Sequence, residues 1–502
     1  MIGFIHIKFN IIKKQMMYCM NWQKYISFKR SRQTKSAIGL NGDYRTALDS
    51  DFGRVVFCSA MRRMHDKTQV FPLTSGDKVH TRLTHSLEVM SIAKSLAINL
   101  CQNEKFVNRY GKQYSCDLER QIISILTTVA LIHDIGNPPF GHHGETTIQV
   151  FFKKYFASNP SLDLTENQKY DFTEFDGNAE GLRILSKTQY LGDTDGLNLT
   201  YATLGAYMKY PNIQRKKVDD YVGNKKHGVF HSEIQLFNNI VDSCSLRIGN
   251  KIKRHPLTFL LEAADTISYL VMDLEDGIAI EKKSFTQVLN NINAYIYKHI
   301  DKTNEVLNLS RDIYNPFTEN FYVEKLIQMQ ESTNNAKKIV NFRVALINYF
   351  VKLVISNFID NLEKIDNGRY NYELLYDDPL QIAKLLGDFE RKNVFNLYHI
   401  VSAELTGEAV IEGILNIVIP KVVGYKSAKD DNRIFEFLPY NMIQLIHQEC
   451  GLYDPEKNKE FIYQMEHIPT YWRLRLVVDW IAGMTDKYAL ETYQRLSGMK
   501  LT

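Results

Sequence analysis

The 502-residue sequence predicts an all-α fold with little β structure. Apolar residues recur at helical spacing in successive segments, whereas the alternating apolar and polar runs typical of strands are few and short. Hydrophobic residues make up 44% of the chain and charged residues 24%, which is the composition of a globular protein with an ample core. The length suits one large domain or roughly two to three smaller ones.

Charge, cysteine content and hydropathy narrow the class of protein. The net charge of +4 is too small for this length to indicate a nucleic-acid partner. Six scattered cysteines without a Cys-x-x-Cys pair indicate reduced thiols in a cytosolic protein, rather than a zinc knuckle or a disulfide framework. Residues 1–19 are predicted to be a leader that is disordered or not translated, too short for a bilayer and interrupted by Lys8. No other segment reaches the length of a membrane helix, so we expect a cytoplasmic protein without membrane contact.

The first long helix is predicted over residues 81–100. Its apolar stripe has helical spacing and consists of Leu83, Leu87, Met90 and Ala97. Thr81 is suited to cap the N-terminus, because its hydroxyl can accept a hydrogen bond from an unpaired N–H of the first turn. His85 lies in the first turns, close to the stripe, where a hydrogen-bonded core histidine is as plausible as a metal ligand.

A second helix is predicted over residues 121–134, and it ends in a dense polar motif. An apolar run over residues 122–132 is long enough for a buried helix, and the last turn carries His133 and Asp134. The chain then breaks at a Gly-Asn-Pro-Pro sequence. Three further polar groups follow this break: His142, His143 and Glu145. Because a buried imidazole and carboxylate are costly unless they are paired, a metal ion is one way to satisfy them.

A third helix is predicted from Pro256, which suits the first helical position, to Gly277, which suits the end. Asp265, Tyr269 and Asp273 are spaced four residues apart and therefore share one helix face. Two carboxylates and a phenol beside an apolar stripe predict a helix that is either half exposed or lines a polar cleft.

The remaining segments add basic and helical regions but no internal repeat. Residues 200–230 are rich in lysine and tyrosine and form the strongest basic cluster of the first half. From residue 281 to residue 502 the apolar stripes keep the helical period, and we expect them to form ordinary core. A second His-Asp pair, His65-Asp66, lies in a polar run, so we expect it at a solvated surface.

Four side chains from the three predicted helices suit one metal ion: His85, His133, Asp134 and Asp265. Two imidazoles and two carboxylates favour Mn²⁺, Mg²⁺, Fe²⁺, Co²⁺ or Ni²⁺, and the set lacks the thiolates typical of structural zinc. Taken alone, His85 could be a core histidine, and Asp265 could cap a helix or pair with an arginine. Only their combination with the His-Asp pair indicates a metal site.

Three motifs carry a family resemblance through their residues and their order. They are Arg82-Leu83-Thr84-His85-Ser86, His133-Asp134-Ile135-Gly136-Asn137-Pro138-Pro139-Phe140-Gly141-His142 and Glu262-Ala263-Ala264-Asp265. Together with segments 68–72, 177–179 and 483–486, they resemble the HD-domain deoxyguanosine triphosphate triphosphohydrolases (dGTPases), from about Asn21 to the C-terminus. The resemblance implies an HD-domain helical fold with additional C-terminal helices. Residues 20–280 would form the HD catalytic core, and residues 281–502 would pack on it and complete the site and the oligomer contacts.

The activity that this resemblance implies is hydrolysis of dGTP to deoxyguanosine and inorganic tripolyphosphate, with one divalent metal ion per site, Mn²⁺ or Mg²⁺. The metal ligands would be His85, His133, Asp134 and Asp265. His142 matches the catalytic histidine of the family, and Glu145 matches the acidic group that orients it. His143 matches no catalytic position, so we expect it at the surface or behind the reacting groups.

The resemblance also implies substrate contacts. The deoxyribose would be held by Gln69, Tyr269 and Asp273, with the Tyr269 ring flat on C2′ and the other two at the 3′-hydroxyl. The triphosphate would be bound by Asn178, Lys209, Tyr210 and Lys226. Several cations suit a substrate with about four negative charges. No motif identifies a group that reads the guanine edge.

Two alternatives to a dGTPase stay open. One is a hydrolase that acts on all dNTPs. The other is a regulatory HD module that binds nucleotide or single-stranded nucleic acid without turnover, although such a module would not need the pair His142 and Glu145. Members of the family are commonly homo-oligomers and some bind single-stranded DNA. We therefore expect a homo-oligomer, whereas the charge neither supports nor excludes DNA binding.

Overall fold

The structure is a computed structural model of the whole chain. It describes residues 20–32, 44–69, 80–110, 116–189, 194–213, 221–281, 335–378, 381–393, 398–426, 433–452 and 465–499. The predicted leader, residues 1–19, lies outside this described part.

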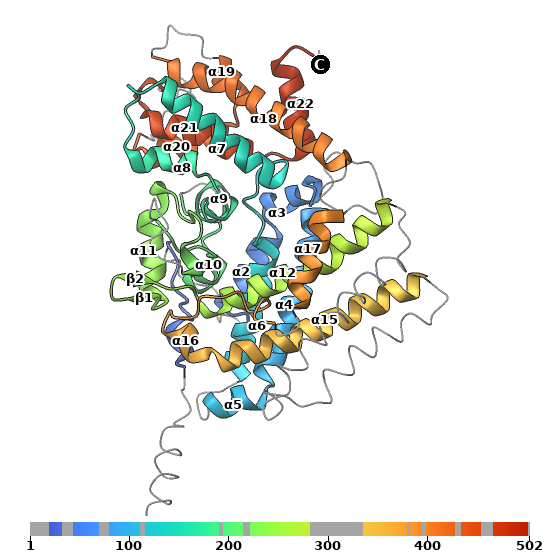
Figure 1. Cartoon of the computed structure of the whole chain (residues 1–502). Coiled ribbons are helices and arrows are strands. Elements are labelled where there is room, and N and C mark those ends of the chain that lie inside the picture. Colours follow the sequence, from blue (N-terminus) through green and yellow to red (C-terminus); the bar gives the residue numbers. More distant parts are fainter. Residues whose placement is uncertain are drawn as a thin grey trace, which may run out of the picture.

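The described residues form an all-α fold, which confirms the predicted fold class (Figure 1). Within them, the regular strands are limited to the two-residue β1 (Arg247–Ile248) and β2 (Lys251–Ile252), which pair antiparallel as a small hairpin. One isolated β-bridge joins Thr68 to Thr81.

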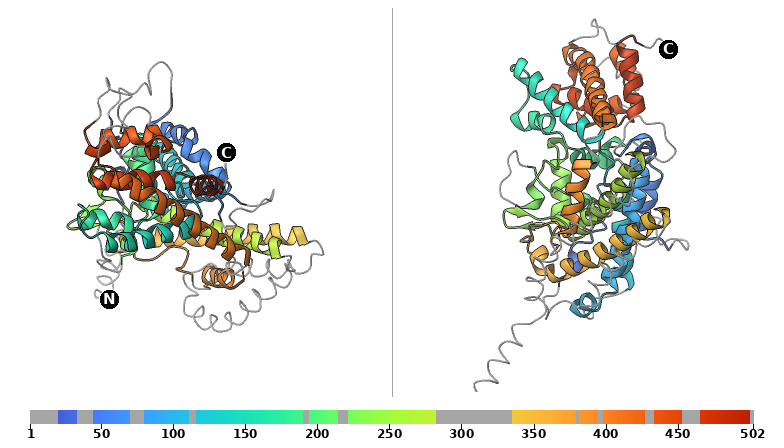
Figure 2. Two further views of the ribbon diagram at one scale, coloured as in Figure 1. Left: turned by 90° about the horizontal axis from the view of Figure 1, so that it is seen from above. Right: turned by 45° about the vertical axis from the view of Figure 1, so that its right-hand side comes forward.

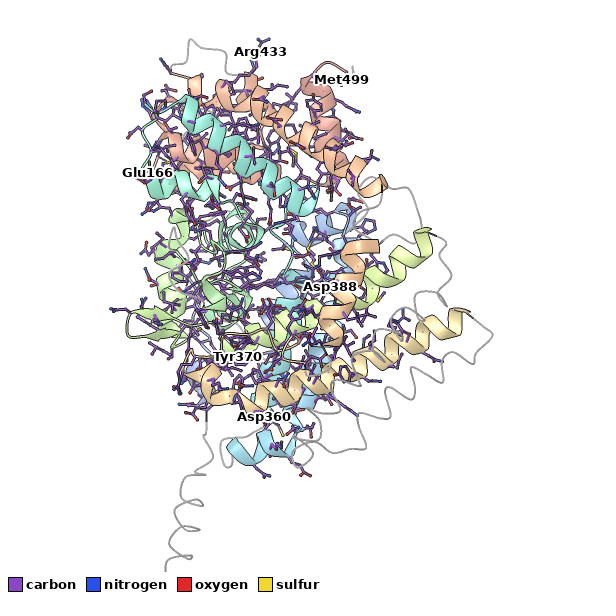
Figure 3. The ribbon with its side chains drawn as sticks, viewed as in Figure 1. Glu166, Asp360, Tyr370, Asp388, Arg433 and Met499 are labelled. Atoms are coloured by element: carbon purple, nitrogen blue, oxygen red, sulfur yellow. The ribbon has the colours of Figure 1, made fainter. Side chains whose placement is uncertain are left out.

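A first core is built around three helices that pack against one another, with further helices around them. The three are α4 (Arg82–Cys101), α6 (Cys116–Ile132) and α12 (Pro256–Glu281), and those around them include α2 (Ala47–Val56), α10 (Tyr201–Tyr207), α15 (Asn335–Asp360), α16 (Leu362–Asp366) and α17 (Ile382–Asn393). Side chains fill the space between these helices (Figure 3). This core brings the N-terminal part of α4, the end of α6 and the middle of α12 together.

The three predicted helices are present, with changes at their ends. α4 is capped by Thr81, whose hydroxyl accepts from Thr84 N–H while the Thr84 hydroxyl accepts from Thr81 N–H, so the predicted cap is confirmed. α6 ends at Ile132, so the His-Asp pair lies just beyond the helix and not in its last turn. α12 begins at Pro256 as predicted, but the end predicted at Gly277 was wrong, because the helix continues for four more residues.

A second core lies at the other end of the molecule, where α7 packs against α18 (Figures 1 and 2). Its helices are α7 (Gly141–Ser158), α8 (Glu166–Thr173), α18 (Tyr398–Gly424), α19 (Arg433–Phe437), α20 (Tyr440–Glu449), α21 (Thr470–Ala482) and α22 (Asp486–Leu496). Segments from both halves of the sequence therefore share this core.

Short elements complete the described part. They are α3 (Ser59–Arg63), α5 (Glu104–Tyr110), α9 (Gly177–Arg183), α11 (Ile234–Ser243), the 3₁₀ turns η1 (Trp22–Lys24), η2 (Met64–Asp66), η5 (Val222–Asn224) and η6 (His231–Glu233), and the π-helical turn η4 (Ile184–Thr188).

A buried ionic network fixes α9 between the two cores. The Arg183 guanidinium donates to Asp479 of α21 at 2.8 Å and to Glu233 at 2.7 Å. Arg475 of α21 donates to Glu180 of α9 at 2.7 Å. Since charges without partners are costly inside a protein, these pairs hold α9 in a defined place. The N-terminus of α9 carries Gly177 and Asn178.

One stretch of α15, Val340–Asp360, is long and apolar enough by length and composition to cross a membrane, contrary to the sequence prediction. In this fold 61% of its apolar window is buried in protein. A core helix of a soluble protein has this character, and α15 packs on α12 and α4.

Candidate active site

Three of the four predicted metal ligands converge from three separate helices. His85 stands in the first turns of α4, His133 directly follows α6, and Asp265 lies in the middle of α12. Asp265 Oδ1 is 3.2 Å from His85 Nε2 and 3.3 Å from His133 Nε2. One ligand atom from each of the three lies within 4.8 Å of the others, a spacing that a single metal ion could bridge.

The chemistry of these donors fits a divalent cation. Nδ1 of His133 lies 2.8 Å from the backbone oxygen of Ala130, so Nδ1 donates there and Nε2 is the nitrogen that would bind a metal ion. Nε2 of His133 is buried and has no hydrogen-bond partner among the described residues. A buried nitrogen lone pair facing a carboxylate oxygen is favourable when a cation lies between them.

The fourth predicted ligand, Asp134, borders this group. Its Oδ1 lies 3.6 Å from His133 Nε2, while its Oδ2 accepts a hydrogen bond from Arg82. Asp265 is balanced in the same way, since its Oδ2 lies 2.5 Å from Lys209 Nζ. Two carboxylates are thus neutralised by two side-chain cations.

Charge keeps both carboxylates ionised despite their burial. Burial alone would raise the pKa of Asp134, but His133 and Arg82 outweigh it and lower that pKa to about 2. For Asp265 the opposing effect of burial is likewise overcome, chiefly by Lys209 and then by His133, so its pKa lies well below the ordinary value. Ionised oxygens are the form in which carboxylates bind metal ions.

His142 and Glu145 form a hydrogen-bonded pair at the start of α7. Nδ1 of His142 donates to Oε2 of Glu145 at 2.7 Å. Oε1 of Glu145 accepts from the backbone N–H of Gly177 at 2.7 Å. The His142 side chain is 75% exposed, whereas Glu145 is buried. The carboxylate is therefore held from both sides, and it leaves Nε2 of the imidazole available for proton transfer.

Glu145 also sets the proton affinity of its partner. The hydrogen bond that His142 donates to Glu145 raises the pKa of His142 more than burial lowers it, so that pKa stands above the ordinary histidine value. An imidazole with a raised pKa keeps its proton to higher pH, as a general acid requires.

We therefore expect Glu145→Gln to shift the alkaline limb of the pH–rate profile to lower pH. The glutamine keeps the shape but loses the charge that stabilises imidazolium, so the acidic form of His142 is depleted sooner as the pH rises. The measurement is kcat/KM between about pH 5 and pH 9 for dGTP, the substrate that the family resemblance implies. Glu404→Gln is the matched control, because Glu404 lies 2.6 Å from the neighbouring His143. A limb that stays in place in Glu145→Gln, or moves equally in the control, contradicts this role.

Three of the residues predicted at the triphosphate contact carboxylates: Lys209 contacts Asp265, and Lys226 and Asn178 contact Asp176. Lys226 Nζ lies 3.0 Å from Asp176 Oδ2, and Asn178 Nδ2 donates to the other oxygen of Asp176 at 2.8 Å. Burial lowers the pKa of Lys209 and of Lys226, but Asp265 and Asp176 respectively reverse this, and both amines remain cationic.

Tyr210, the other residue predicted at the triphosphate, is buried beside Arg254. The guanidinium carbon lies 5.5 Å from the centroid of the tyrosine ring. The tyrosine directly follows Lys209 in the sequence.

Of the residues predicted at the deoxyribose, Tyr269 lies one turn after Asp265 on α12. Its hydroxyl is 2.8 Å from that of Tyr376. Gln69 follows the β-bridge residue Thr68, and its Oε1 is buried without a hydrogen-bond partner among the described residues. The side chain of Asp273 lies outside the described part.

Arg82 and Tyr376 are two examples of residues that contact this group and had no role in the sequence prediction. Arg82 stands in the first of the three motifs, but its pairing with Asp134 has no local signal. Tyr376 comes from a loop 107 residues after Tyr269, and no spacing rule connects the two. The residues predicted at the surface behave as expected, since His65 and Asp66 form an exposed pair and His143 is half-exposed beside Glu404.

Comparisons with known proteins match two parts of the chain to family models. The HD domain model matches residues 82–174, and the phosphohydrolase-associated domain model matches residues 442–495. The first match contains His85, the His-Asp pair and the His142–Glu145 pair, and the second contains α21 and most of α22.

Curated relatives extend the similarity over nearly the whole chain. A deoxyguanosinetriphosphate triphosphohydrolase-like protein of Listeria monocytogenes is 36% identical over 502 residues, covering 96% of this chain and all of the relative. One from Synechocystis is 31% identical over 497 residues, with 96% and 100% coverage. A deoxyguanosinetriphosphate triphosphohydrolase of Klebsiella pneumoniae is 28% identical over 528 residues, with 96% and 99% coverage.

Proposed function

This chain belongs to the deoxyguanosinetriphosphate triphosphohydrolase-like family of HD-domain proteins, and from that premise we propose that it hydrolyses dGTP to deoxyguanosine and inorganic tripolyphosphate. The observation that carries the proposal is the convergence of His85, His133 and Asp265 within 4.8 Å, on a chain that also presents the His142–Glu145 pair. A binding module has no need of that acid–base pair. The reaction class is therefore metal-assisted hydrolysis.

The metal site in this proposal comprises His85, His133, Asp134 and Asp265. A divalent ion such as Mn²⁺ or Mg²⁺ bound there supplies a Lewis acid for the phosphate oxygens and a water of lowered pKa. Two anionic and two neutral ligands suit such ions, which accept oxygen and imidazole donors.

The chain's own residues supply proton transfer and positioning. Water attacks the α-phosphorus and gives up a proton to solvent, the bond from phosphorus to the 5′ oxygen breaks, and the water oxygen leaves with the tripolyphosphate. The 5′ oxygen is a poor leaving group, so it takes a proton from Nε2 of His142, while Glu145 holds the opposite nitrogen. Lys209 and Lys226 bind the triphosphate charge, and in binding it they exchange carboxylate partners for phosphate oxygens.

Selection of a deoxyribose rests on Tyr269. Its ring is fixed at the hydroxyl by Tyr376 and by its position one turn from Asp265 on α12. A ring packed flat on C2′ would leave no room for a ribose hydroxyl. Gln69 and Asp273 complete the proposed sugar contacts at the 3′ position.

Product analysis with each of the four dNTPs, in Mg²⁺ or Mn²⁺, tests this function. We expect tripolyphosphate and deoxyguanosine from dGTP, with dGTP preferred over the other three nucleotides. Equal rates on all four would identify the broader dNTP triphosphohydrolase instead, since no residue group here is assigned to the guanine edge. Pyrophosphate with dGMP would overturn the proposed bond cleavage. Homo-oligomerisation stays a prediction from the family resemblance, and the cytoplasmic location stays a prediction from the cysteine content and hydropathy of the sequence. Single-stranded DNA binding stays an open possibility.

A further inference from the structure

A buried carboxylate at the start of α22 connects three distant segments of the chain. Oδ2 of Asp486 accepts from the backbone N–H of Thr68 at 3.0 Å and from its hydroxyl at 2.6 Å. Oδ1 of the same residue accepts from the backbone N–H of Phe140 at 2.9 Å. Thr68 directly precedes Gln69, and Phe140 stands two residues before His142. One side chain therefore contacts both the segment of the proposed sugar contact and the segment of the proposed general acid.

The segment held by Oδ1 has an unfavourable backbone. Phe140, the N-cap of α7, and Gly141, the first residue of that helix, both have positive φ, 61° and 58°. A phenylalanine rarely adopts this left-handed conformation, and it persists only where the surroundings enforce it. The Phe140 ring packs on Gly407 of α18, where an added Cβ would come within 2.5 Å of the ring. The direction in which α7 starts, and with it the place of His142, thus depends on α18 and α22.

A second link runs beside the first. Nζ of Lys67, which is buried, donates to the backbone oxygen of Asn137 at 2.6 Å and to that of Ala482 at 2.7 Å. These contacts join the same three segments as Asp486 does. Lys67 directly precedes Thr68, Asn137 lies three residues before Phe140, and Ala482 is the last residue of α21. Lys67 and Asp486 therefore form two parallel sets of polar contacts between these three segments. Asp486 is the residue whose two carboxylate oxygens accept hydrogen bonds from two different segments.

We propose that Asp486 is a positioning residue, which sets the places of His142 and Gln69 relative to one another without touching the substrate. The proposal rests on the proposed function for its effect on catalysis. The proposal assigns a role to the phosphohydrolase-associated region, residues 442–495, which lies outside the match to the HD domain model. Through Asp486, that region holds Phe140 and Gly141, the residues of positive φ at the start of α7.

Asp486→Asn is the direct test. The amide keeps the shape but has a single acceptor oxygen, so either Thr68 or the Phe140 N–H faces an NH₂ group. Because small displacements of catalytic groups cost up to about 100-fold, we expect kcat for dGTP to fall by about 10-fold to 100-fold, and KM to rise through Gln69. Hydrogen–deuterium exchange at residues 138–146 should increase, and Mn²⁺ affinity should stay within about twofold of the parent.

Asp51→Asn provides a matched control. Oδ2 of Asp51 accepts from the N–H and the hydroxyl of Thr200 at 3.0 and 2.6 Å, the same pair of contacts that Asp486 makes with Thr68. It is also buried, but it holds the start of α10. We expect a loss of Tm that is at least as large, because Asp51 also pairs with Arg30 at 2.7 Å, with kcat within about twofold of the parent and no change in exchange at residues 138–146.

Three results would overturn the inference. They are parent-like kcat and KM in Asp486→Asn, unchanged exchange at residues 138–146 in that variant, and an equal loss of kcat in Asp51→Asn. If Asp486→Asn does not fold, Thr68→Val removes only the hydroxyl contact at 2.6 Å, and a rise in KM of about threefold or more is then required. A parent that leaves every dNTP intact would refute the proposed function, and the exchange measurement would still decide whether Asp486 holds the entry to α7.

Discussion

Asp265→Asn is expected to remove most of the metal affinity and about 10³-fold of kcat/KM for dGTP. One oxygen of Asp265 lies within 3.3 Å of both buried imidazoles, so the carboxylate is the shared member of the candidate metal site. A divalent ion contributes several kcal/mol to transition-state charge stabilisation, and about 4 kcal/mol corresponds to about 10³-fold in rate. The amide has a similar shape, but it lacks the negative charge that a divalent ion requires.

The measurement combines Mn²⁺ titration by calorimetry with initial rates on dGTP. Asp66→Asn is the control, because Asp66 belongs to the other His-Asp pair, which is exposed. It should bind Mn²⁺ and turn over dGTP like the parent. Removing metal from the parent with EDTA should abolish activity, and Mn²⁺ should restore it. If Asp265→Asn bound Mn²⁺ with parent affinity, the proposed metal site would be wrong.

Apolar spacing and capping residues in the sequence predicted the helices that carry the site. The same local patterns failed where packing in the folded protein decides the length of a helix. Thr81 caps α4 as predicted, because a hydroxyl and the N–H groups of the first turn are neighbours in sequence. Gly277 does not end α12, since a glycine inside a helix costs only about 1 kcal/mol and packing can exceed that cost. Helix type therefore follows from the sequence more closely than helix length does.

Contacts between distant segments could not be predicted in this way. His85, His133 and Asp265 were grouped because two imidazoles and a carboxylate on separate helices are a metal-binding combination. Nothing in the local sequence indicates that Asp486 bonds to Phe140, 346 residues earlier. That contact depends on the packing of the second core, which combines α7 with helices from the C-terminal part. The types of metal ligand could thus be predicted from the sequence, whereas long-range contacts such as that of Asp486 with Phe140 could be found only in the structure.

His142→Ala is expected to lower kcat for dGTP by about 10²–10⁴-fold while Mn²⁺ affinity stays unchanged. Nδ1 of His142 is occupied by Glu145, and Glu145 is held by Gly177, so Nε2 is the nitrogen that can donate to the 5′ oxygen. Without that donor, deoxyguanosine leaves as an alkoxide, and the alkaline limb assigned to His142 disappears from the pH–rate profile.

His143→Ala is the matched control, since it removes the adjacent imidazole, which pairs with Glu404 at 2.6 Å. It should keep kcat within about twofold of the parent, because an exposed ion pair contributes little and this one is not assigned to the reaction. Single-turnover rates separate the chemical step from product release in both variants. Turnover at the parent rate in His142→Ala, or an equal loss in His143→Ala, would remove His142 from the mechanism.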